Sequence, residues 1–330
     1  MEDSGATVLV TGATGFLGRR LCERLRSEGV RVVALGRRAG AGPWEEFLEV
    51  DLASAAPESS QLKGVSTIYH LACKAHAVPE WANEADNYRP VVVEGTRRML
   101  DSAREAGIPR FIHMSSVKAM GEGNPPGLPL HPMDEAWPHT PQSPYGMAKA
   151  EAEKLVLESG LPHAVVLRPV MVYGPGGKGN LPQMVEAVRR GRFPPIPDNG
   201  NRRSMIHVDD LVEFSIRAAI YPIGAGKVYI LAGPQAHSTR ELYDLIRQSL
   251  GMPGVTWSIP SALLQAAAFA GSILGALLNR RLPLDRETLR KLTGSAWYSS
   301  ARASCELDYT ACHTVKEWLA LEKFAKNSRM

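Results

Sequence analysis

A tyrosine and a lysine four residues apart are the side chains in this sequence best suited to moving a proton. Tyr145 and Lys149 would lie on one face of a helix, because residues i and i+4 are neighbours on a helical surface. A free phenol has a pKa of about 10, too high for base chemistry at neutral pH, but a nearby ammonium charge favours the phenolate. The pair therefore predicts general acid/base catalysis at an alcohol or ketone oxygen.

Two adjacent serines offer a hydroxyl as the candidate third member of this catalytic group. Ser115 and Ser116 follow a short apolar run that begins at Phe111 and is typical of a buried strand. At the end of a strand, either hydroxyl could hold a substrate oxygen beside the phenol. Interconverting an alcohol and a ketone also requires hydride transfer, so the same edge must hold a redox cofactor.

Three glycines at a strand-to-helix junction predict where that cofactor binds. Gly12, Gly15 and Gly18 have GxxGxxG spacing between a β-branched run and a helical pattern. Such glycines form a tight turn, let the backbone approach a pyrophosphate and let the helix pack closely on the strand. The next predicted strand ends at Gly36 and Arg37, where NAD-preferring sites carry an acid. An arginine can pair with a 2′-phosphate, so we favour NADP over NAD; an exposed loop arginine is the alternative.

The elements that must position these residues alternate between strand and helix patterns, which is typical of βαβ units. Strands are predicted over 7–11, 30–35, 47–50, 67–71, 111–115 and 164–168, and helices over 15–29, 87–106, 145–159 and 181–190. A helix over 208–220 and a strand over 227–231 could return to the main sheet, and the rest is mostly helical from 238 onward. We expect an α/β fold, a doubly wound parallel sheet with a smaller C-terminal cap over its carboxyl edge.

This pattern divides the chain into two predicted domains. A dinucleotide-binding Rossmann domain takes 1–172 plus 203–232, and a substrate-binding domain takes 173–202 plus 233–330. The Pro- and Gly-rich stretch 121–143 is too long for a simple connector, which predicts a functional loop or a lid.

Composition places the chain among ordinary globular proteins. Its 330 residues are 44% hydrophobic and 22% charged, and the formal net charge of +4 is not gathered in basic runs. We therefore expect no nucleic-acid partner. The four cysteines lack the spacing of metal ligands, so we expect no metal site and a reduced, cytoplasmic setting. The N-terminus also lacks the basic and apolar regions of a signal peptide.

One uncharged stretch of 17 residues, 262–278, is close to the lower limit for a membrane span. Its alanines, its glycines and Gln265 dilute the hydrophobicity. We expect a helix packed on the body of the protein, with peripheral membrane contact as the alternative.

The run TGATGFLG (11–18), with the serine and the Tyr/Lys pair in order behind it, resembles the extended short-chain dehydrogenases/reductases of the NAD(P)-dependent epimerase/dehydratase family. The resemblance implies that Ser116, aligned on an S-x-x-x-x-G stretch ending at Gly121, acts with Tyr145 and Lys149, and that Ser115 is the fallback. It implies a cofactor site formed by Gly12, Thr14, Gly15, Phe16, Leu17, Gly18, Arg37, Asp51, Leu52, Leu71, Ala72, Tyr145, Lys149 and Pro169. Family members commonly pair through a four-helix interface, which implies a homodimer through the helices predicted over 87–106 and 145–159.

The resemblance continues on the substrate side through RPVMVYGPG (168–176) and NRRSMIHVDDL (201–211). It implies substrate contacts from Ser116, Lys118, Asn180, Leu181 and Arg203, and further positive charge from Lys178, Arg192 and Arg202. A cationic cleft suits a nucleotide diphosphate, whereas an enzyme for a neutral substrate would leave these residues in ordinary loops.

Several substrates remain open within this family. The runs 115–122, 172–185 and 201–211 look most like reductases of UDP-2-acetamido-2,6-dideoxy-4-keto-hexoses, and a UDP-hexose 4-epimerase needs the same residues. The segments 259–278 and 292–302 resemble the C-terminal part of 3β-hydroxysteroid dehydrogenases, which favours a sterol-like lipid. A clear R-x-G-D element, which many epimerases use on the nucleotide, is missing near 281–290.

Two departures from the family pattern narrow the chemistry. Related dehydratases carry an Asp-Glu pair where this chain has Val117 and Lys118, so we do not expect elimination of water. The helix that usually reads N-V-x-G-T has valine in place of the asparagine, in the run Val92-Val-Glu-Gly-Thr96, which puts a solvent-relay contact in doubt. A non-catalytic dinucleotide sensor is disfavoured, because such proteins usually lack the Tyr/Lys pair.

Overall fold

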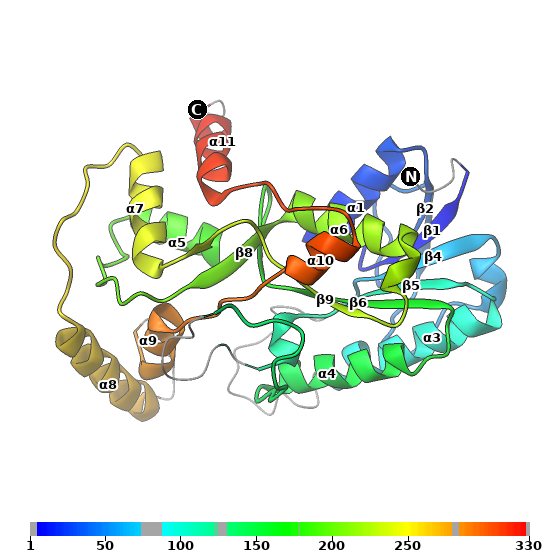
Figure 1. The fold of residues 1–330 in the computed structure, drawn as a ribbon, viewed down its shortest axis with the longest axis horizontal. Helices are drawn as coiled ribbons and strands as arrows, with labels where there is room; N and C mark the ends of the chain where they lie inside the picture. Colours follow the sequence, from blue (N-terminus) through cyan, green and yellow to red (C-terminus); the bar gives the residue numbers. More distant parts are fainter. Residues whose placement is uncertain are drawn as a thin grey trace.

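The computed structural model describes residues 5–73, 88–121, 123, 131–177, 179–278 and 284–327. A parallel sheet of seven strands forms its centre, in the order β3-β2-β1-β4-β5-β6-β9 (Figure 1). The strands are β1 (Thr7–Thr11), β2 (Arg31–Gly36), β3 (Glu46–Glu49), β4 (Val65–His70), β5 (Arg110–Met114), β6 (His163–Pro169) and β9 (Val228–Leu231). This is the doubly wound α/β sheet predicted from the sequence, and β9 extends it beside β6.

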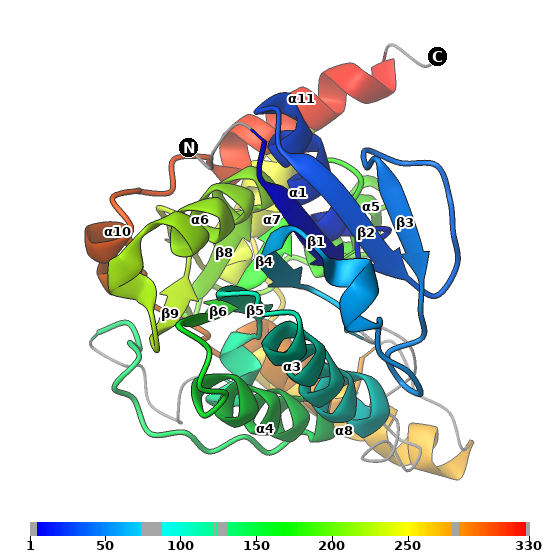
Figure 2. The same cartoon turned by 90° about the vertical axis from the view of Figure 1, so that its right-hand side faces the viewer.

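Helices cover both faces of this sheet (Figure 2). One face carries α1 (Phe16–Ser27) and α6 (Val208–Ile220); the other carries α3 (Gly95–Glu105) and α4 (Pro144–Leu157). In β1, Val8 and Val10 belong to the core beneath α1 and α6, whereas Leu9 belongs to the core beneath α3. Because both faces are buried, the strands are continuous apolar runs instead of alternating ones.

The start of α4 shows how local sequence positions a candidate catalytic side chain. Pro144 occupies the first turn, and the Ser143 hydroxyl caps the helix by accepting the Gly146 N–H at 3.1 Å. A Cβ on Gly146 would lie 2.5 Å from the Lys118 carbonyl oxygen, so glycine lets α4 press against the 3-10 turn η3 (Val117–Ala119). This contact places Tyr145 beside the end of β5.

A second sheet of three strands lies beyond the carboxyl edge of the first. It is formed by β10 (Ala236–His237), β8 (Arg203–His207) and β7 (Met171–Tyr173), in that order. Around it pack α5 (Asn180–Arg189), α7 (Thr239–Ser249) and α11 (Val315–Asn327), through a core that includes Leu181, Ile246 and Trp318. The sequence analysis predicted none of these three short strands, and it assigned 203–207 to the nucleotide-binding domain. The domain boundaries stay a prediction.

The remaining helices are α8 (Ser261–Leu277), α9 (Arg286–Thr293) and α10 (Ala301–Glu306), with short turns η1 (Ser59–Leu62) and η4 (Pro222–Gly224). After α9 the chain returns to the second sheet, where the Ala296 N–H donates to the Arg202 carbonyl at 2.7 Å. Within the residues that the structure describes, no helix has both the length and the hydropathy to cross a bilayer.

The helix predicted over 87–106 differs from a regular α-helix. Asn87 lies outside the described residues, and the helix is a π-helix, η2, over Pro90–Glu94 before it continues as α3. The π-turn closes with the Gly95 N–H donating to the Pro90 carbonyl.

Candidate active site

A cleft of about 2620 Å³ runs along the carboxyl edge of the main sheet and continues to the second sheet. Nearly every residue assigned from the sequence to cofactor, catalysis or substrate lines it. The two exceptions are Lys149 and Leu181, whose side chains are buried, 2% and 2% exposed. Parallel strands end at one common edge, so residues far apart in the sequence gather there.

The glycine turn fits a dinucleotide pyrophosphate. Gly12 has a φ of +68°, and a Cβ there would lie 3.0 Å from the Ala72 backbone nitrogen. A Cβ on Gly18 would lie 2.3 Å from the Gly12 carbonyl oxygen, so α1 can pack this closely only with glycine. Gly15 is the N-cap of α1 and has no side chain to cap the first backbone donors. These donors and the helix dipole face the cleft, which is the arrangement that binds phosphate.

Beside the glycine turn, the cleft is lined by residues that come directly after β2, β3 and β4, where an adenosine is expected. Arg37 lines it after β2, Asp51 and Leu52 line it after β3, and Leu71 and Ala72 line it after β4. The Asp51 carboxylate accepts the Ala53 N–H at 3.0 Å, which fixes the turn after β3. An exposed arginine and an ordered acidic turn thus stand where the sequence predicted the adenosine ribose and adenine.

Ser116 and Tyr145 meet at the centre of the cleft. The Ser116 hydroxyl is near enough to the Tyr145 phenol to lower its pKa, and it accepts the Lys118 N–H at 3.3 Å. Lys149 lies one helical turn beyond Tyr145, where its Nζ donates to the Met114 carbonyl at 2.7 Å. The end of β5 thus anchors both the serine and the lysine.

The surroundings of the Tyr145 hydroxyl favour its neutral form. Burial raises the pKa of Tyr145 well above its ordinary value, contact with Cys73 raises it further, and the Ser116 hydrogen bond lowers it. The Tyr88 ring packs edge-on against Tyr145 with centroids 5.4 Å apart. The sequence analysis assigned no role to Cys73 or Tyr88, because neither follows a recognisable spacing from the Tyr/Lys pair.

A buried hydrogen-bond chain supports the turn beside the cofactor site. The Thr11 hydroxyl accepts the Leu71 and Ala72 N–H groups at 3.1 and 3.0 Å, so it donates to His70 Nδ1 at 3.0 Å. His70 Nε2 then donates to the Thr96 hydroxyl at 3.1 Å, which itself donates to a backbone carbonyl at 2.6 Å. Burial, with the charge of Lys149, lowers the pKa of His70 to about 3, so the ring is neutral.

A buried ion pair holds the other side of the catalytic helix. Glu153, one turn beyond Lys149 on α4, accepts two hydrogen bonds from Arg168 at 2.9 and 2.6 Å. Their side chains are 5% and 3% exposed. Ser115 also donates to Glu153, and Arg168 contacts His139 Nε2 at 3.1 Å. Ser115 and Ser116 both line the cleft, but the Ser115 hydroxyl is bonded to Glu153 in this network, whereas Ser116 lies beside Tyr145.

The substrate half of the cleft is lined from several parts of the chain. Asn180 is the first residue of α5, Lys118 follows Ser116, and Arg203 begins β8; all three line the cleft. Leu181 packs into the core of the second sheet, so it could approach a substrate only through its backbone. Arg203 Nη1 donates to the carbonyls of Lys291 and Gly294, the latter at 3.3 Å.

Those contacts bring two further cations, Arg290 and Lys291 of α9, to the cleft. The sequence analysis found no nucleotide-binding element near these residues. Arg290 and Lys291 reach the cleft because the segment after α9 pairs with β8 through a β-bridge between Arg203 and Ala296. A pairing between segments so distant in the chain leaves no local pattern from which to predict it.

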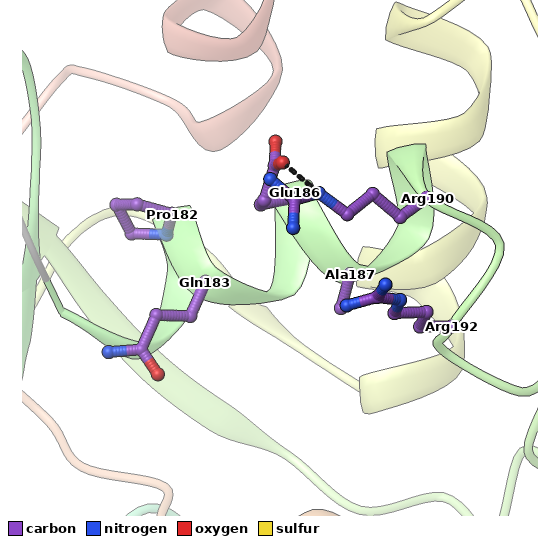
Figure 3. Close-up of a pocket in the computed structure, with 6 residues that line it drawn as sticks. All are labelled: Pro182, Gln183, Glu186, Ala187, Arg190 and Arg192. Carbon is purple, nitrogen blue, oxygen red and sulfur yellow. Dashed lines mark ion pairs between the residues drawn. The ribbon is translucent and has the colours of Figure 1, made fainter.

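Two of the three other cations suggested for the cleft, Arg192 and Arg202, do not line it. Arg192 lies with Arg190 and Glu186 at a separate shallow pocket on α5 (Figure 3). Arg202 pairs with Glu241 at 3.0 Å, and Lys178 lies outside the described residues. The pairing of Glu186 with Arg190 at that pocket neutralises part of its charge.

His207, His313 and two aspartates cluster where α6 meets the segment after α10. The two imidazole rings stack with centroids 4.7 Å apart and 21° between their planes. Nearly parallel rings cannot direct their in-plane lone pairs at one shared ion. The buried Asp210 carboxylate instead accepts from Tyr309, from His313 Nδ1 at 2.8 Å and from two backbone N–H groups. This geometry indicates a tether for the C-terminal segment.

Comparison with known proteins agrees with this site. Residues 8–232 match the NAD dependent epimerase/dehydratase family. The UDP-glucose 4-epimerase of Vibrio cholerae is 31% identical over 292 residues, which cover 86% of this chain and 85% of that protein. The 2-alkyl-3-oxoalkanoate reductase of Stenotrophomonas maltophilia is 28% identical, and the match covers 94% of this chain and 97% of that protein.

A solved structure similar to this fold is MoeE5 in complex with UDP-glucose and NAD. Its TM-score is 0.75 at 26% sequence identity, and the match covers 98% of this chain and all of the other. The fold matches that of this solved structure. The chain belongs to the NAD-dependent epimerase/dehydratase family and is an enzyme of the extended short-chain dehydrogenase/reductase type.

Proposed function

We propose that the chain catalyses NAD(P)-dependent hydride transfer at a carbinol or ketone carbon of a nucleotide sugar. The observation that carries the proposal is that Ser116 and Tyr145 line the same cleft as the glycine turn and Arg203. A substrate carbon beside Ser116 and Tyr145 would lie between the dinucleotide half and the diphosphate half of the same cleft.

Each catalytic residue has one task in this proposal. When bound, the nicotinamide exchanges a hydride with the substrate carbon. The Tyr145 phenol gives its proton to the alkoxide oxygen during reduction and takes it back during oxidation. Ser116 holds that oxygen through its hydroxyl, and the charge of Lys149 favours the phenolate that reduction leaves behind. Because burial raises the pKa of Tyr145, the phenol is protonated and holds the proton that reduction requires.

The substrate half supports a nucleotide diphosphate. The N-terminus of α5 at Asn180 supplies backbone donors, and Arg203, Arg290 and Lys291 supply charge. The similarity to a UDP-glucose 4-epimerase and to a structure that binds UDP-glucose supports the same substrate class. Within it we favour reduction of a UDP-4-keto-6-deoxy-N-acetylhexosamine, with 4-epimerisation of a UDP-hexose as the alternative.

The mechanism is tested with Tyr145→Phe. We expect turnover to fall below detection while the dissociation constant for the dinucleotide stays within about twofold, because the phenol donates its proton only during reaction. Tyr221→Phe is the matched control, since Tyr221 does not line the cleft. An active Tyr145→Phe enzyme would contradict the assignment.

The substrate class is tested separately by thermal shift with UDP. We expect UDP to raise the melting temperature of the parent and of Arg202→Ala, but not that of Arg203→Ala, each compared with its own ligand-free value. Arg202 is the control because it pairs with Glu241 and does not line the cleft. If no nucleotide diphosphate stabilises the parent, the sugar substrate is wrong even though the hydride chemistry can stand.

Product analysis distinguishes the competing reactions. A reductase consumes one reduced dinucleotide per product, whereas an epimerase interconverts two UDP-hexoses without net cofactor consumption. A third candidate, reduction of an apolar ketone such as a sterol, is favoured by the exposed apolar helix α8 and by the similarity to a 2-alkyl-3-oxoalkanoate reductase. Cofactor-dependent reduction of long-chain 3-oxo compounds, without response to UDP, would support it.

We further propose that NADP is preferred, because Arg37 lines the adenosine end of the cleft. Arg37→Ala should weaken NADPH binding by about tenfold and leave NADH binding unchanged, whereas Arg38→Ala should change neither. Equal affinities of the parent for NADPH and NADH would contradict this role.

We also propose a homodimer through α3 and α4. The α4 side chains Met147 and Leu157 are 48% and 40% exposed, which is consistent with a covered face. Light scattering that gives the mass of a single chain at micromolar concentration would contradict it.

A further inference from the structure

The helix α8 has two faces that differ sharply in their contacts. One stripe packs on the protein: Leu264 and Ala268 are 4% and 0% exposed. A Cβ on Gly271 would lie 2.0 Å from the Leu284 carbonyl oxygen, and the Ser272 hydroxyl accepts the Arg286 N–H at 3.0 Å. This stripe fixes α8 against the start of α9.

The opposite face of α8 is apolar and open. Its large side chains are about half exposed: Leu263 61%, Phe269 54%, Ile273 49%, Leu274 48% and Leu278 53%. At 100° per residue Leu263, Phe269 and Ile273 lie on the far side of the helix from Leu264 and Ala268. Leu274 lies at the edge of that face, and Leu278 is exposed at the C-terminal end of the helix. Residues 261–278 contain no charge. A helix that is apolar all round is normally buried, so this face needs a partner.

Its position favours a partner outside this chain. Both views place α8 at the periphery, with α9 beside it in Figure 1 and its end projecting past α4 in Figure 2. Because the open face points away from the packed stripe, it cannot close over the cleft without breaking the contacts of Gly271 and Ser272.

The residues around this face suit a lipid surface. Trp257, in the segment that leads into α8, is 62% exposed, and tryptophan is favoured at the boundary between lipid and water. The exposed Arg286 guanidinium lies 5.9 Å over the Phe269 ring. Arginines beside an apolar helix face attract anionic lipid head groups.

A second copy of this chain is a less suitable partner for the open face of α8. Five half-exposed side chains offer roughly 100 Å² each, about 500 Å² in total, against about 800 Å² per partner in a stable interface. Pairing two such faces would also bring the two copies of Arg286 together.

We propose that α8 docks on an anionic membrane surface, with its open face in the interface and Arg286 at the head groups. The helix lies on the bilayer and does not span it. Because α9 carries both Arg286 and the cleft-lining Arg290 and Lys291, docking places the mouth of the active site next to the lipid surface. The proposal is independent of the nucleotide-sugar assignment.

The test is sedimentation of the full chain with vesicles of phosphatidylcholine alone and of phosphatidylcholine with phosphatidylglycerol. We expect binding to the anionic vesicles that weakens with salt and falls about tenfold or more in Ile273→Glu. Ile223→Glu is the matched control, because Ile223 is 51% exposed on a different part of the surface and should bind like the parent. Bilayer contact should also quench the fluorescence of Trp257 by brominated lipid, a signal that Trp257→Phe removes.

Three results would overturn the proposal. They are no sedimentation of the parent, equal binding by Ile273→Glu and the parent, and a parent dimer that Ile273→Glu dissociates without any vesicle binding. The last would identify a second copy as the partner. Melting temperatures of both glutamate variants in the absence of lipid establish that each is folded.

Discussion

Replacing Glu153 by glutamine would remove one charge from a pair that water cannot reach. Glutamine keeps the size of the side chain and can still accept a hydrogen bond from Ser115 and from Arg168. What it loses is the carboxylate charge, so the Arg168 guanidinium, 3% exposed in its side chain, stays buried without a counterion. The helix that carries Tyr145 and Lys149 would be destabilised at its third turn.

The size of this effect follows from the burial. Removing one partner of a buried ion pair costs about 3–5 kcal/mol, and the retained hydrogen bonds place Glu153→Gln near about 3 kcal/mol. With about 2.1 cal/mol/K of unfolding entropy per residue, 330 residues give about 0.7 kcal/mol/K. The melting temperature should therefore fall by about 4 °C.

Chemical denaturation of the ligand-free protein measures this loss, and α4 offers a matched control. Glu151 lies on the same helix and pairs with Arg89 through two hydrogen bonds at 2.5 and 2.8 Å, but its side chain is 39% exposed. Glu151→Gln should leave the midpoint close to that of the parent, because water screens the pair. Adding Arg168→Gln to Glu153→Gln should recover part of the loss, since no buried charge then remains unpaired.

The reasoning would be refuted if Glu153→Gln and Glu151→Gln shifted the denaturation midpoint equally. It would also be refuted if the stability losses of Glu153→Gln and Arg168→Gln simply added up in the double variant. Additive losses of unfolding free energy would mean that the two charges do not interact.

Three further predictions concern the cofactor half of the molecule. Gly18→Ala should weaken dinucleotide binding at least tenfold, because its Cβ would lie 2.3 Å from a backbone oxygen, whereas Gly40→Ala, with nothing within 4 Å, should bind normally in the same titration. His113→Phe should be neutral or stabilising in urea denaturation, because neither buried ring nitrogen has a partner among the residues that the structure describes; a loss above about 1 kcal/mol would contradict this. The free energy of unfolding should fall as pH drops from about 6.5 toward 3. Burial holds the pKa of His70 at about 3 in the folded protein, below the unfolded value of 6.5, so the unfolded state takes up the proton first. A free energy of unfolding that does not change between pH 7 and pH 4 would contradict this.

The main sheet and the helices that flank it could be predicted because their signals are local. The first strand, predicted over 7–11, and the helix predicted over 208–220 have the same bounds in the structure, because continuous apolar runs and helical periodicity are read within one window. The other predicted strands agree to within two residues at each end, as is expected where chain ends fray.

The second sheet and part of the site could not be predicted, because they depend on contacts between distant segments. The strands β7 and β10 have three and two residues, too short to show a period. Arg290 reaches the cleft only because the chain after α9 bridges to Arg203, and Cys73 reaches Tyr145 only through the end of β4. The Tyr/Lys pair was visible from its spacing, whereas the burial that sets the Tyr145 pKa is a property of the folded chain.

The π-helix η2 affects how this chain should be aligned with its relatives. A π-turn commonly adds one residue to a helix, so a relative with a regular helix is matched correctly only with a one-residue gap within 90–94. The family asparagine could then correspond to residue 91, 92 or 93. All three are valine, so no amide is available there in any register. The polar group that this stretch does offer to the interior is the Thr96 hydroxyl, one turn later, bonded to His70.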